Sequence, residues 1–471
     1  MPKKTIVLVL LGAWLAACGP VQLVQAMDWP QFGWNVERSS APPVSAGIAS
    51  ADLGSLVRQQ VRIDGTVDSS AIYLQGVAID GATHNAFFVT TTYGKTIAID
   101  ASTGSVLWEY TPPSYDALAG TYRITTATPV ADPNRKYIYA AAPDGMVRKL
   151  AISDGRVVWA TPITRLPSRE KIASPLSFFN GRVIAATDGY IGDQPPYQGH
   201  VAIINAATGK IEHVWNSLCS NRHELIDPAS CPQSDSGIWG RAGVVIDPAT
   251  GDLYLATGNA LWNGATDWGD SVVELSPNAK RILGNYTPTD TERLNLDDLD
   301  LGSTSPVLLG HGLVAQGGKD GLIRILNWSA MSGAAPHRGG ASFTTRTPSG
   351  DLLFTAPAVR HDGAVTWLFA ADNRATAAWT VAGTKLHRVW QSNHPGTSPV
   401  VADGMLFAYD PRGGLYIYAA TTGRELAELP CGSGHWNSPI VVDGMIALPV
   451  GNANSHLTSG VLDIWRIEPA P

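Results

Sequence analysis

Three polar residues in the middle of the chain, Asn259, Asp300 and Lys319, have side chains that could form a reactive site. Asn259 ends the segment SGIWGRAGVVIDPATGDLYLATGN, Asp300 lies in DDLDLGST, and Lys319 lies in GGKDG. Each adjoins a β-like apolar run, so similar places in neighbouring copies of one unit carry an amide, a carboxylate and an ammonium group. Together they form either a cofactor site or the rim of a scaffold.

The unit that positions these residues is a repeat of four apolar strands separated by D-G, N-G and T-G turns. Its clearest copy is TATPVADPNRKYIYAAAPDGMVRKLAISDGRVVWA, residues 126–160. Repeats of this length with four strands are typical of β-propeller blades. A lone sheet of apolar strands cannot bury both faces, so the blades must pack on one another and close into a ring. The sequence predicts an all-β fold, a single eight-bladed β-propeller of four-stranded antiparallel blades.

We assign residues 1–26 to a signal segment, 27–67 to an N-terminal arm and linker, and 68–471 to the propeller. The first and last copies are expected to share a blade, completed by a strand near Trp29 to Phe32. Four tryptophans close copies at one repeat position, and we interpret them as packing between blades. They are Trp108, Trp159, Trp215 and Trp390.

The N-terminus has the features of an export signal. Lys3 and Lys4 precede an apolar run that is too short for an ordinary membrane-spanning helix. The run ends in LAACG, which resembles the bacterial lipobox and would make Cys18 a lipidated first residue. The alternative is cleavage after Ala26, which leaves a soluble protein. Either route predicts a periplasmic protein, lipid-anchored to a bacterial membrane in the first case.

The remaining cysteines and the net charge narrow the function further. Cys219 and Cys231 lie in a polar, loop-like segment of an exported chain, so we expect a disulfide between them. Cys431 is interpreted as a buried apolar thiol. The C-x-x-C-H motif of covalent haem is absent. The formal charge of -7, without any Lys/Arg run, argues against nucleic acid as a partner. We expect a monomer.

Polar residues recur at two positions of the repeat that meet at one end of the ring. The ends of the second strands carry Asp144, Asp188, Asn259, Lys319, Asn373, Asp410 and Asn452. The starts of the innermost strands carry Thr126, Trp239, Asp298, Asp300, Ser303, Thr397, His435, Trp436 and Asn437. Each alone is a typical turn residue. As a ring, they indicate an axial site.

The turn-and-Trp unit AIDASTGSVLW, the WG before a strand, and LYLATGN together resemble the quinoprotein dehydrogenase propellers, which hold pyrroloquinoline quinone (PQQ) with calcium. The propeller lipoprotein of the outer-membrane β-barrel assembly machinery shares this repeat. The repeat therefore specifies a fold, and activity must be argued from the site.

The resemblance implies a role for each candidate residue. Trp239 would stack on the quinone, with Trp436 as a further cofactor contact. Asn259 and Asp300 would bind Ca²⁺, an ion that prefers such oxygen ligands. Asp300 would be the catalytic base, with Asp298 as the alternative, and Lys319 would contact the quinone. A carboxylate would then take the alcohol proton while hydride passes to the quinone.

The chain also departs from the family pattern. Ile191 stands where the family has a glutamate ligand, so Asp188 and Asp193 are the carboxylates left to serve as metal ligands. The vicinal cysteine pair that covers the cofactor is replaced by YRITTATP. Polyvinyl-alcohol dehydrogenase also lacks some of these features.

Two functions follow. The first is a PQQ- and Ca²⁺-dependent dehydrogenase that oxidises a small alcohol or sugar and passes electrons to a separate acceptor. The second is a non-catalytic propeller lipoprotein that binds other envelope proteins as a scaffold.

Overall fold

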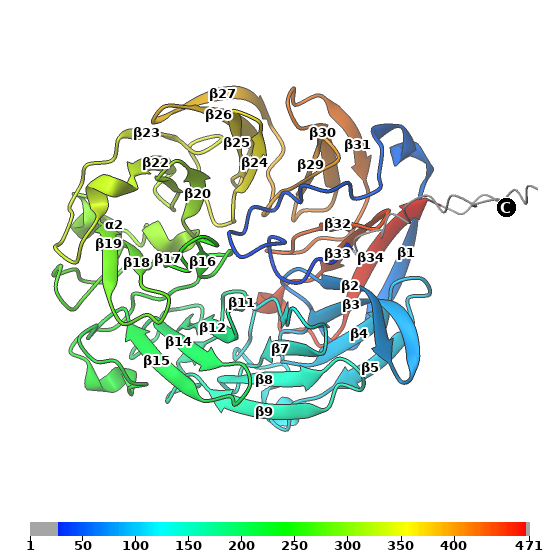
Figure 1. The fold of residues 1–471 in the computed structure, drawn as a ribbon, viewed down its shortest axis with the longest axis horizontal. Coiled ribbons are helices and arrows are strands. Elements are labelled where there is room, and N and C mark those ends of the chain that lie inside the picture. Colours follow the sequence, from blue (N-terminus) through cyan, green and yellow to red (C-terminus); the bar gives the residue numbers. More distant parts are fainter. Residues whose placement is uncertain (1–26, 468–471) are drawn as a thin grey trace, which may run out of the picture.

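The computed structural model describes residues 27–467, and the predicted signal segment with Cys18 lies outside this range. The strands form eight four-stranded antiparallel sheets arranged as blades around a central axis (Figure 1). The predicted eight-bladed β-propeller is confirmed. Within the part of the chain that is described, no helix is long and apolar enough to cross a bilayer.

The first four blades run in chain order, each from its innermost to its outermost strand. Blade 1 is β2 (Ile72–Ile79), β3 (Ala82–Thr90), β4 (Thr96–Asp100) and β5 (Val106–Tyr110), and blade 2 is β6 (Val130–Ala131), β7 (Tyr137–Ala141), β8 (Met146–Ala151) and β9 (Val157–Pro162). Blade 3 is β11 (Ser177–Phe179), β12 (Arg182–Ala186), β14 (His200–Asn205) and β15 (Ile211–Asn216), and blade 4 is β16 (Val245–Ile246), β17 (Leu253–Ala256), β18 (Val272–Leu275) and β19 (Ile282–Tyr286).

The other four blades complete the ring. Blade 5 is β20 (Val307–Gly310), β21 (Leu313–Gln316), β22 (Leu322–Asn327) and β23 (Phe343–Arg346), and blade 6 is β24 (Ala358–Asp362), β25 (Val365–Ala371), β26 (Thr376–Ala382) and β27 (Lys385–Ser392). Blade 7 is β28 (Val400–Ala402), β29 (Met405–Tyr409), β30 (Leu415–Ala419) and β31 (Glu425–Leu429), and blade 8 is β32 (Ile440–Val442), β33 (Met445–Val450), β34 (Gly460–Ile467) and β1 (Leu56–Ile63).

Short elements decorate the loops between strands. The α-helical turns are α1 (Tyr115–Leu118) and α2 (Thr291–Leu296), and a two-stranded sheet pairs β10 (Glu170–Lys171) with β13 (Asp188–Gly189). The 3₁₀ turns are η1 (Ser50–Ser55), η2 (Pro228–Ser230), η3 (Leu301–Ser303), η4 (Trp328–Met331) and η5 (Ala453–Ser455).

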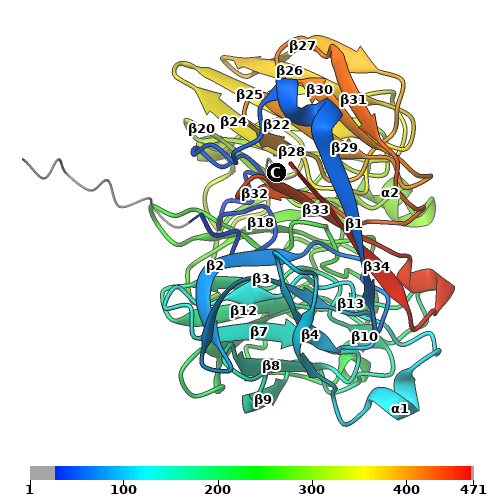
Figure 2. The ribbon, with the colours of Figure 1, turned by 90° about the vertical axis from the view of Figure 1, so that its right-hand side faces the viewer.

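The ring is closed by the first strand of the chain. β1 pairs with β34 over the register Leu56↔Ile467 to Ile63↔Gly460, and the two strands lie side by side in Figure 2. β1 thereby forms the outer edge of blade 8, and two chain ends that would otherwise leave open sheet edges cover each other. The closing strand comes from the range that the sequence assigned to the arm and linker.

The N-terminal arm that precedes β1 crosses the middle of the ring (Figure 1). Trp29 forms a bridge with Tyr73 of β2, and further backbone hydrogen bonds join the arm to β6, β16, β24 and β28. The prediction that a strand near Trp29 to Phe32 completes the last blade is wrong. Both aromatic rings are only 1% exposed, and their segment contacts inner strands, whereas the open edge of blade 8 lies on the outside of the ring.

Three of the four repeated tryptophans dock on the next blade in the same way. The indole N–H of Trp108, Trp159 and Trp390 donates to a backbone carbonyl of the following blade, at Ile152, Ala206 and Ala420 respectively. The glycine of the neighbouring T-G or D-G turn leaves room for each ring. Trp215 is 2% exposed in the core between blades 3 and 4. The predicted role of these four tryptophans in packing between blades is confirmed.

This docking predicts the effect of adding one methyl group at a turn. A Cβ on Gly209 would lie 2.8 Å from the Trp159 ring, whereas one on Gly181 has no neighbour within 4 Å, and both glycines have a φ of +74°. We expect Gly209→Ala to lower the free energy of unfolding by about 3 kcal/mol and Gly181→Ala by about 1 kcal/mol, since only the first adds overpacking to backbone strain. Urea denaturation measures both. Equal losses would contradict the docking.

Candidate functional site

The cavity at one end of the channel has a volume of about 700 Å³ and is lined by loops that precede the innermost strands or follow the second strands. Every residue predicted for catalysis, cofactor contact or metal binding lines it: Asp188, Asp193, Trp239, Asn259, Asp298, Asp300, Lys319 and Trp436. The repeat positions therefore converge as expected. The chemical role of each residue stays a prediction.

The rest of the predicted ring divides between the cavity wall and the layer behind it. Thr126, Asn373, Thr397 and His435 also line the cavity. Others are held by neighbours: Asp144 pairs with Arg148, Asp410 with Arg412, and Asn452 accepts from the backbone of Asn454. Ser303 and Asn437 are fully buried and bond to backbone carbonyls.

The floor of the cavity is aromatic. The rings of Trp239 and Trp436 stack with centroids 5.7 Å apart and planes inclined by 22°. Phe354 lies 6.1 Å from Trp239 and 6.3 Å from Trp436, and the His435 ring stacks on Trp436 at 4.2 Å. Aromatic surfaces of this kind bind flat ring systems through stacking and burial of apolar area.

An ion pair stands beside this floor. The Lys319 ammonium bonds to Asp300 Oδ2 and, at 2.8 Å, to Asp298 Oδ1, and it lies 5.4 Å from the centre of the Trp239 ring. Burial alone would lower the pKa of Lys319, but the two carboxylates outweigh it and raise that pKa. Lys319 is therefore a fixed cation. The other oxygen of Asp300 accepts the backbone N–H of Asn259 at 2.5 Å.

A second buried carboxylate, Asp188, lies across the cavity on β13. Burial raises its pKa to about 7; Lys171 of β10, 3.6 Å away, acts against this rise, while Asp193 and Asp300 add to it. Asp193 accepts a hydrogen bond from the Tyr197 hydroxyl at 3.1 Å. The carboxylates of the wall thus repel one another, and each lysine offsets part of that repulsion.

Two glycines allow the carboxylates to approach this closely. A Cβ on Gly237 would lie 1.9 Å from Asp188 Oδ1, and one on Gly258 would lie 2.7 Å from Asp300 Oδ1 and 3.3 Å from the Trp239 indole nitrogen. The segments SGIWG and TGN place them directly before the aromatic floor and directly before Asn259. The absence of a side chain at Gly237 and Gly258 leaves room for the carboxylates of Asp188 and Asp300.

Sequence reasoning missed several residues of the site. Phe354 lies in a loop that follows blade 5, and Lys171 lies on a strand outside the four-stranded repeat. Asp68 and Arg241, both fully buried, lie behind His435 and Trp436. Asp68 is the one with a usable signal, since it lies shortly before the innermost strand of blade 1, as Ser303 does before that of blade 5.

Comparison with known proteins supports the interpretation of the repeat as that of quinoprotein-type propellers. A family profile described as outer membrane protein assembly factor BamB matches residues 42–229. The alcohol dehydrogenase (quinone) dehydrogenase subunit of Acetobacter aceti is 24% identical over 43% of this chain, and the match spans 32% of that protein. The polyvinylalcohol dehydrogenase of a Pseudomonas species is 21% identical over 87% of this chain and 68% of its own length.

The solved structure of quinohemoprotein alcohol dehydrogenase from Comamonas testosteroni superposes with a TM-score of 0.68 at 15% identity, covering 94% of this chain and 81% of that one. At this identity the likeness shows the fold. The resemblance to the quinoprotein propellers is confirmed. Because the matches to the quinone alcohol dehydrogenase subunits span only about a third of their length, substrate and partners do not follow from them.

The site fits a quinone better than it fits the calcium that the quinoprotein resemblance implies. The aromatic floor, the adjoining Lys319 cation and the space kept by Gly258 suit a planar, electron-poor ring. Of the carboxylates predicted to bind Ca²⁺, Asp188 and Asp300 are instead paired with lysines, and Asp193 accepts a hydrogen bond from the Tyr197 hydroxyl. Across residues 27–467, no three His, Cys, Asp or Glu side chains converge as a metal site.

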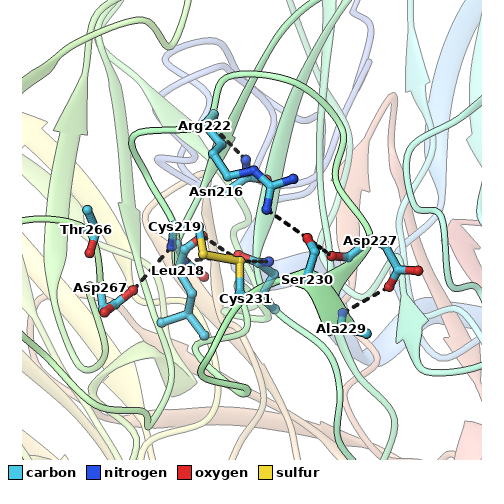
Figure 3. The surroundings of a disulfide bond; sticks show 12 residues. Asn216, Leu218, Cys219, Arg222, Asp227, Ala229, Ser230, Cys231, Thr266 and Asp267 are labelled. Carbon is cyan, nitrogen blue, oxygen red and sulfur yellow. Dashed lines mark hydrogen bonds between the residues drawn. A yellow bond between two sulfur atoms is a disulfide. The ribbon is translucent and has the colours of Figure 1, made fainter.

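The disulfide is linked to the cavity wall through Gln198 and Glu170. Cys219 and Cys231 are paired, as predicted, with Cα atoms 6.2 Å apart (Figure 3). Gln198 donates to Cys231 Sγ, and its backbone N–H donates to Glu170, the residue before Lys171. Cys431 is half-buried rather than fully buried and accepts the N–H of Gly414, and burial raises its thiol pKa to about 11.

A buried ion pair holds β10, and with it Lys171, against blade 3. His200 Nε2 lies 3.0 Å from Glu170 Oε1, its Nδ1 lies 2.6 Å from Asn216 Oδ1, and the His200 and Glu170 side chains are 0% exposed. Burial alone would lower the pKa of His200, but the carboxylate and the amide outweigh it and raise that pKa. Each ring nitrogen faces an acceptor oxygen, which favours the protonated form of His200.

This pair makes stability depend on pH. Because the folded pKa of His200 is raised, its contribution is fully present below the unfolded value of about 6.5 and is lost as pH rises through the folded pKa. We expect Glu170→Gln to cost about 3 kcal/mol at pH 6 and to remove this dependence. Urea denaturation across pH measures it. The control Glu212→Gln removes a partly exposed pair with Arg182. It should change the free energy of unfolding by less than about 1 kcal/mol and keep the wild-type dependence of that free energy on pH. A larger loss for Glu212→Gln than for Glu170→Gln would contradict the role of His200.

Proposed function

We propose that the protein is an exported quinoprotein dehydrogenase that oxidises an alcohol or sugar with PQQ held in the axial cavity. The observation that carries this proposal is the fixed ammonium of Lys319 beside the stacked rings of Trp239 and Trp436. The two rings would bind a flat, electron-poor quinone, and Lys319 would supply a positive charge beside it.

The residues of this chain would divide the work. Trp239, Trp436 and Phe354 would bind the ring, and Lys319 would orient a quinone oxygen. Asp300 would hold Lys319 in place and, as the resemblance implies, could act as a base once that ion pair opens. When bound, PQQ supplies the two-electron oxidant. A separate electron carrier would be the final acceptor.

The export signal completes the proposal. We propose that the first 26 residues direct the chain to the periplasm and that Cys18 carries a lipid anchor. Incorporation of radiolabelled palmitate into the wild type, and its absence from Cys18→Ser, would test the anchor. Cleavage after Ala26 would leave both proteins unlabelled.

The central test uses the purified protein mixed with PQQ. We expect a bound-quinone absorbance spectrum that survives gel filtration, together with reduction of a dye in the presence of some members of a panel of alcohols and sugars. If no quinone is retained at micromolar concentration, the proposal is wrong. The scaffold function then becomes the better explanation, supported by the profile match to the assembly factor.

The aromatic floor predicts which substitutions weaken quinone binding. We expect Trp239→Ala to weaken PQQ binding by at least tenfold, in line with about 1–3 kcal/mol for stacking a flat base on an aromatic side chain. Trp239→Phe keeps an aromatic face and should stay within about threefold of wild type. Titration followed by the absorbance of bound quinone measures both. Unchanged binding by Trp239→Ala would place the quinone elsewhere.

The two aspartates beside Lys319 make a matched pair. The Asp300 side chain is 4% exposed and the Asp298 side chain 64% exposed, although both bond to the ammonium. We expect Asp300→Asn to lower kcat/KM at least a hundredfold and to weaken quinone binding, because the cation loses its buried partner. Asp298→Asn should stay within about threefold, since solvent screens an exposed pair. Dye-reduction kinetics decide; the opposite ranking would make Asp298 the functional carboxylate.

A further inference from the structure

We propose that His435, oriented by the buried carboxylate of Asp68, accepts the hydroxyl proton of the substrate in the axial cavity. This inference rests on the proposed function and adds to it a residue that the quinoprotein resemblance does not supply. Four features of the cavity support it: the contacts of Asp68, the free edge of the His435 imidazole, the stacking that fixes this ring, and the hydrogen bonds and ion pairs that occupy the cavity carboxylates.

Asp68 is a fully buried carboxylate that holds His435 in place. Its Oδ2 accepts from His435 Nδ1 at 2.8 Å and from the Ala453 N–H at 2.9 Å, and its Oδ1 accepts from the Trp436 N–H at 2.9 Å. Burial alone would raise the pKa of Asp68, but His435, Arg241 and the Ala453 N–H outweigh it and hold the pKa below its usual range. The two backbone N–H groups that donate to its oxygens identify both oxygens as hydrogen-bond acceptors, as expected of the ionised form.

This acceptor geometry determines which ring nitrogen of His435 carries the hydrogen when the imidazole is neutral. Since Asp68 Oδ2 can only accept, His435 Nδ1 must carry the hydrogen, which leaves a lone pair on Nε2 at the other edge of the ring. The His435 side chain is 24% exposed and lines the cavity. Among the described residues, Nε2 has no hydrogen-bond partner. It is free to accept a proton from a bound ligand.

Stacking holds this edge in place beside the aromatic floor. The imidazole lies 4.2 Å from the Trp436 ring at 21°, and Trp436 in turn stacks on Trp239. The His435 backbone N–H donates to Asn437 Oδ1 at 3.0 Å. Arg241 lies under Trp436, 5.6 Å from its centroid, and donates to the Asp68 carbonyl at 3.5 Å. The His435 ring is thus held in place by Trp436 and by the fully buried Asp68, and Arg241 packs against Trp436.

The carboxylates of the cavity are less available as bases. Both oxygens of Asp300 are engaged, one by Lys319 and one by the Asn259 N–H, so a proton could be taken only after an ion pair opens. Asp188 lies 3.6 Å from Lys171, and Asp298 bonds to Lys319. Proton transfer to His435 requires none of these contacts to break.

The step balances with the quinone as the oxidant. The substrate O–H bond breaks and its proton passes to His435 Nε2, while the carbon-bound hydrogen leaves with its electron pair for the quinone and the C=O double bond forms. Asp68 stabilises the imidazolium that results, as a buried carboxylate does for a general-base histidine. The imidazolium then returns its proton to water.

The first test separates turnover from quinone binding. In the full-length protein loaded with PQQ, we expect His435→Gln to lower kcat at least a hundredfold while the dissociation constant for PQQ, measured by absorbance titration, stays within about threefold. His387→Gln, on the exposed outer strand β27, is the matched control and should behave as wild type. A wild-type kcat for His435→Gln overturns the inference and points back to Asp300.

The second test needs no activity. Long-range ¹H–¹⁵N spectra of protein labelled at histidine should show His435 as the Nδ1–H tautomer. In Asp68→Asn an amide replaces the carboxylate, so we expect this pattern to change and kcat to fall as in His435→Gln, with PQQ binding kept. An Nε2–H tautomer in the wild type overturns the inference. A wild type that retains no PQQ would instead refute the proposed function, whatever the tautomer.

Discussion

The closure of the ring by β1 and β34 is the constraint on which the site depends. Eight residue pairs join strands from opposite ends of the described chain, Leu56–Ile63 and Gly460–Ile467. Asp68 follows β1 by five residues, His435 precedes the innermost strand of blade 8, and Ala453 follows its second strand, so the contacts of Asp68 join the two ends of the ring. The part of the site around His435 therefore joins the first blade to the last.

Electrostatic balance within the wall is the second organising principle. Two buried carboxylates, Asp188 and Asp300, face the same cavity and would repel each other, and the chain supplies Lys171 and Lys319 as internal counter-charges. Such pairs cost desolvation and contribute little net stability. What they provide is a set of charges that is already oriented around the aromatic floor, and preorganised charge is what stabilises a polar transition state.

Much of the fold and part of the site could be predicted because the repeat is local. Strand periodicity and T-G turns recur in each copy, and equivalent repeat positions must meet at one end of a ring, which brought Trp239, Asn259, Asp300 and Lys319 together correctly. The closing strand could not be predicted, since β1 lies outside the repeat and pairs with a strand at the other end of the chain. The Asp68–His435 contact, which joins residues 367 positions apart, depends on that same closure.

The hydrogen bonds of Asp300 and His435 explain how one cavity could hold both a carboxylate that fixes a cation and a histidine that accepts a proton. A carboxylate that neutralises Lys319 keeps a cation beside the aromatic floor, and it loses this effect if it takes a proton. Histidine has no such conflict, because its proton-accepting edge is separate from the edge that Asp68 holds. In the proposed dehydrogenase, Asp300 would therefore hold the Lys319 cation, and Asp68 would hold the proton acceptor His435. His435 could then take a proton while Asp300 and Lys319 keep their charges.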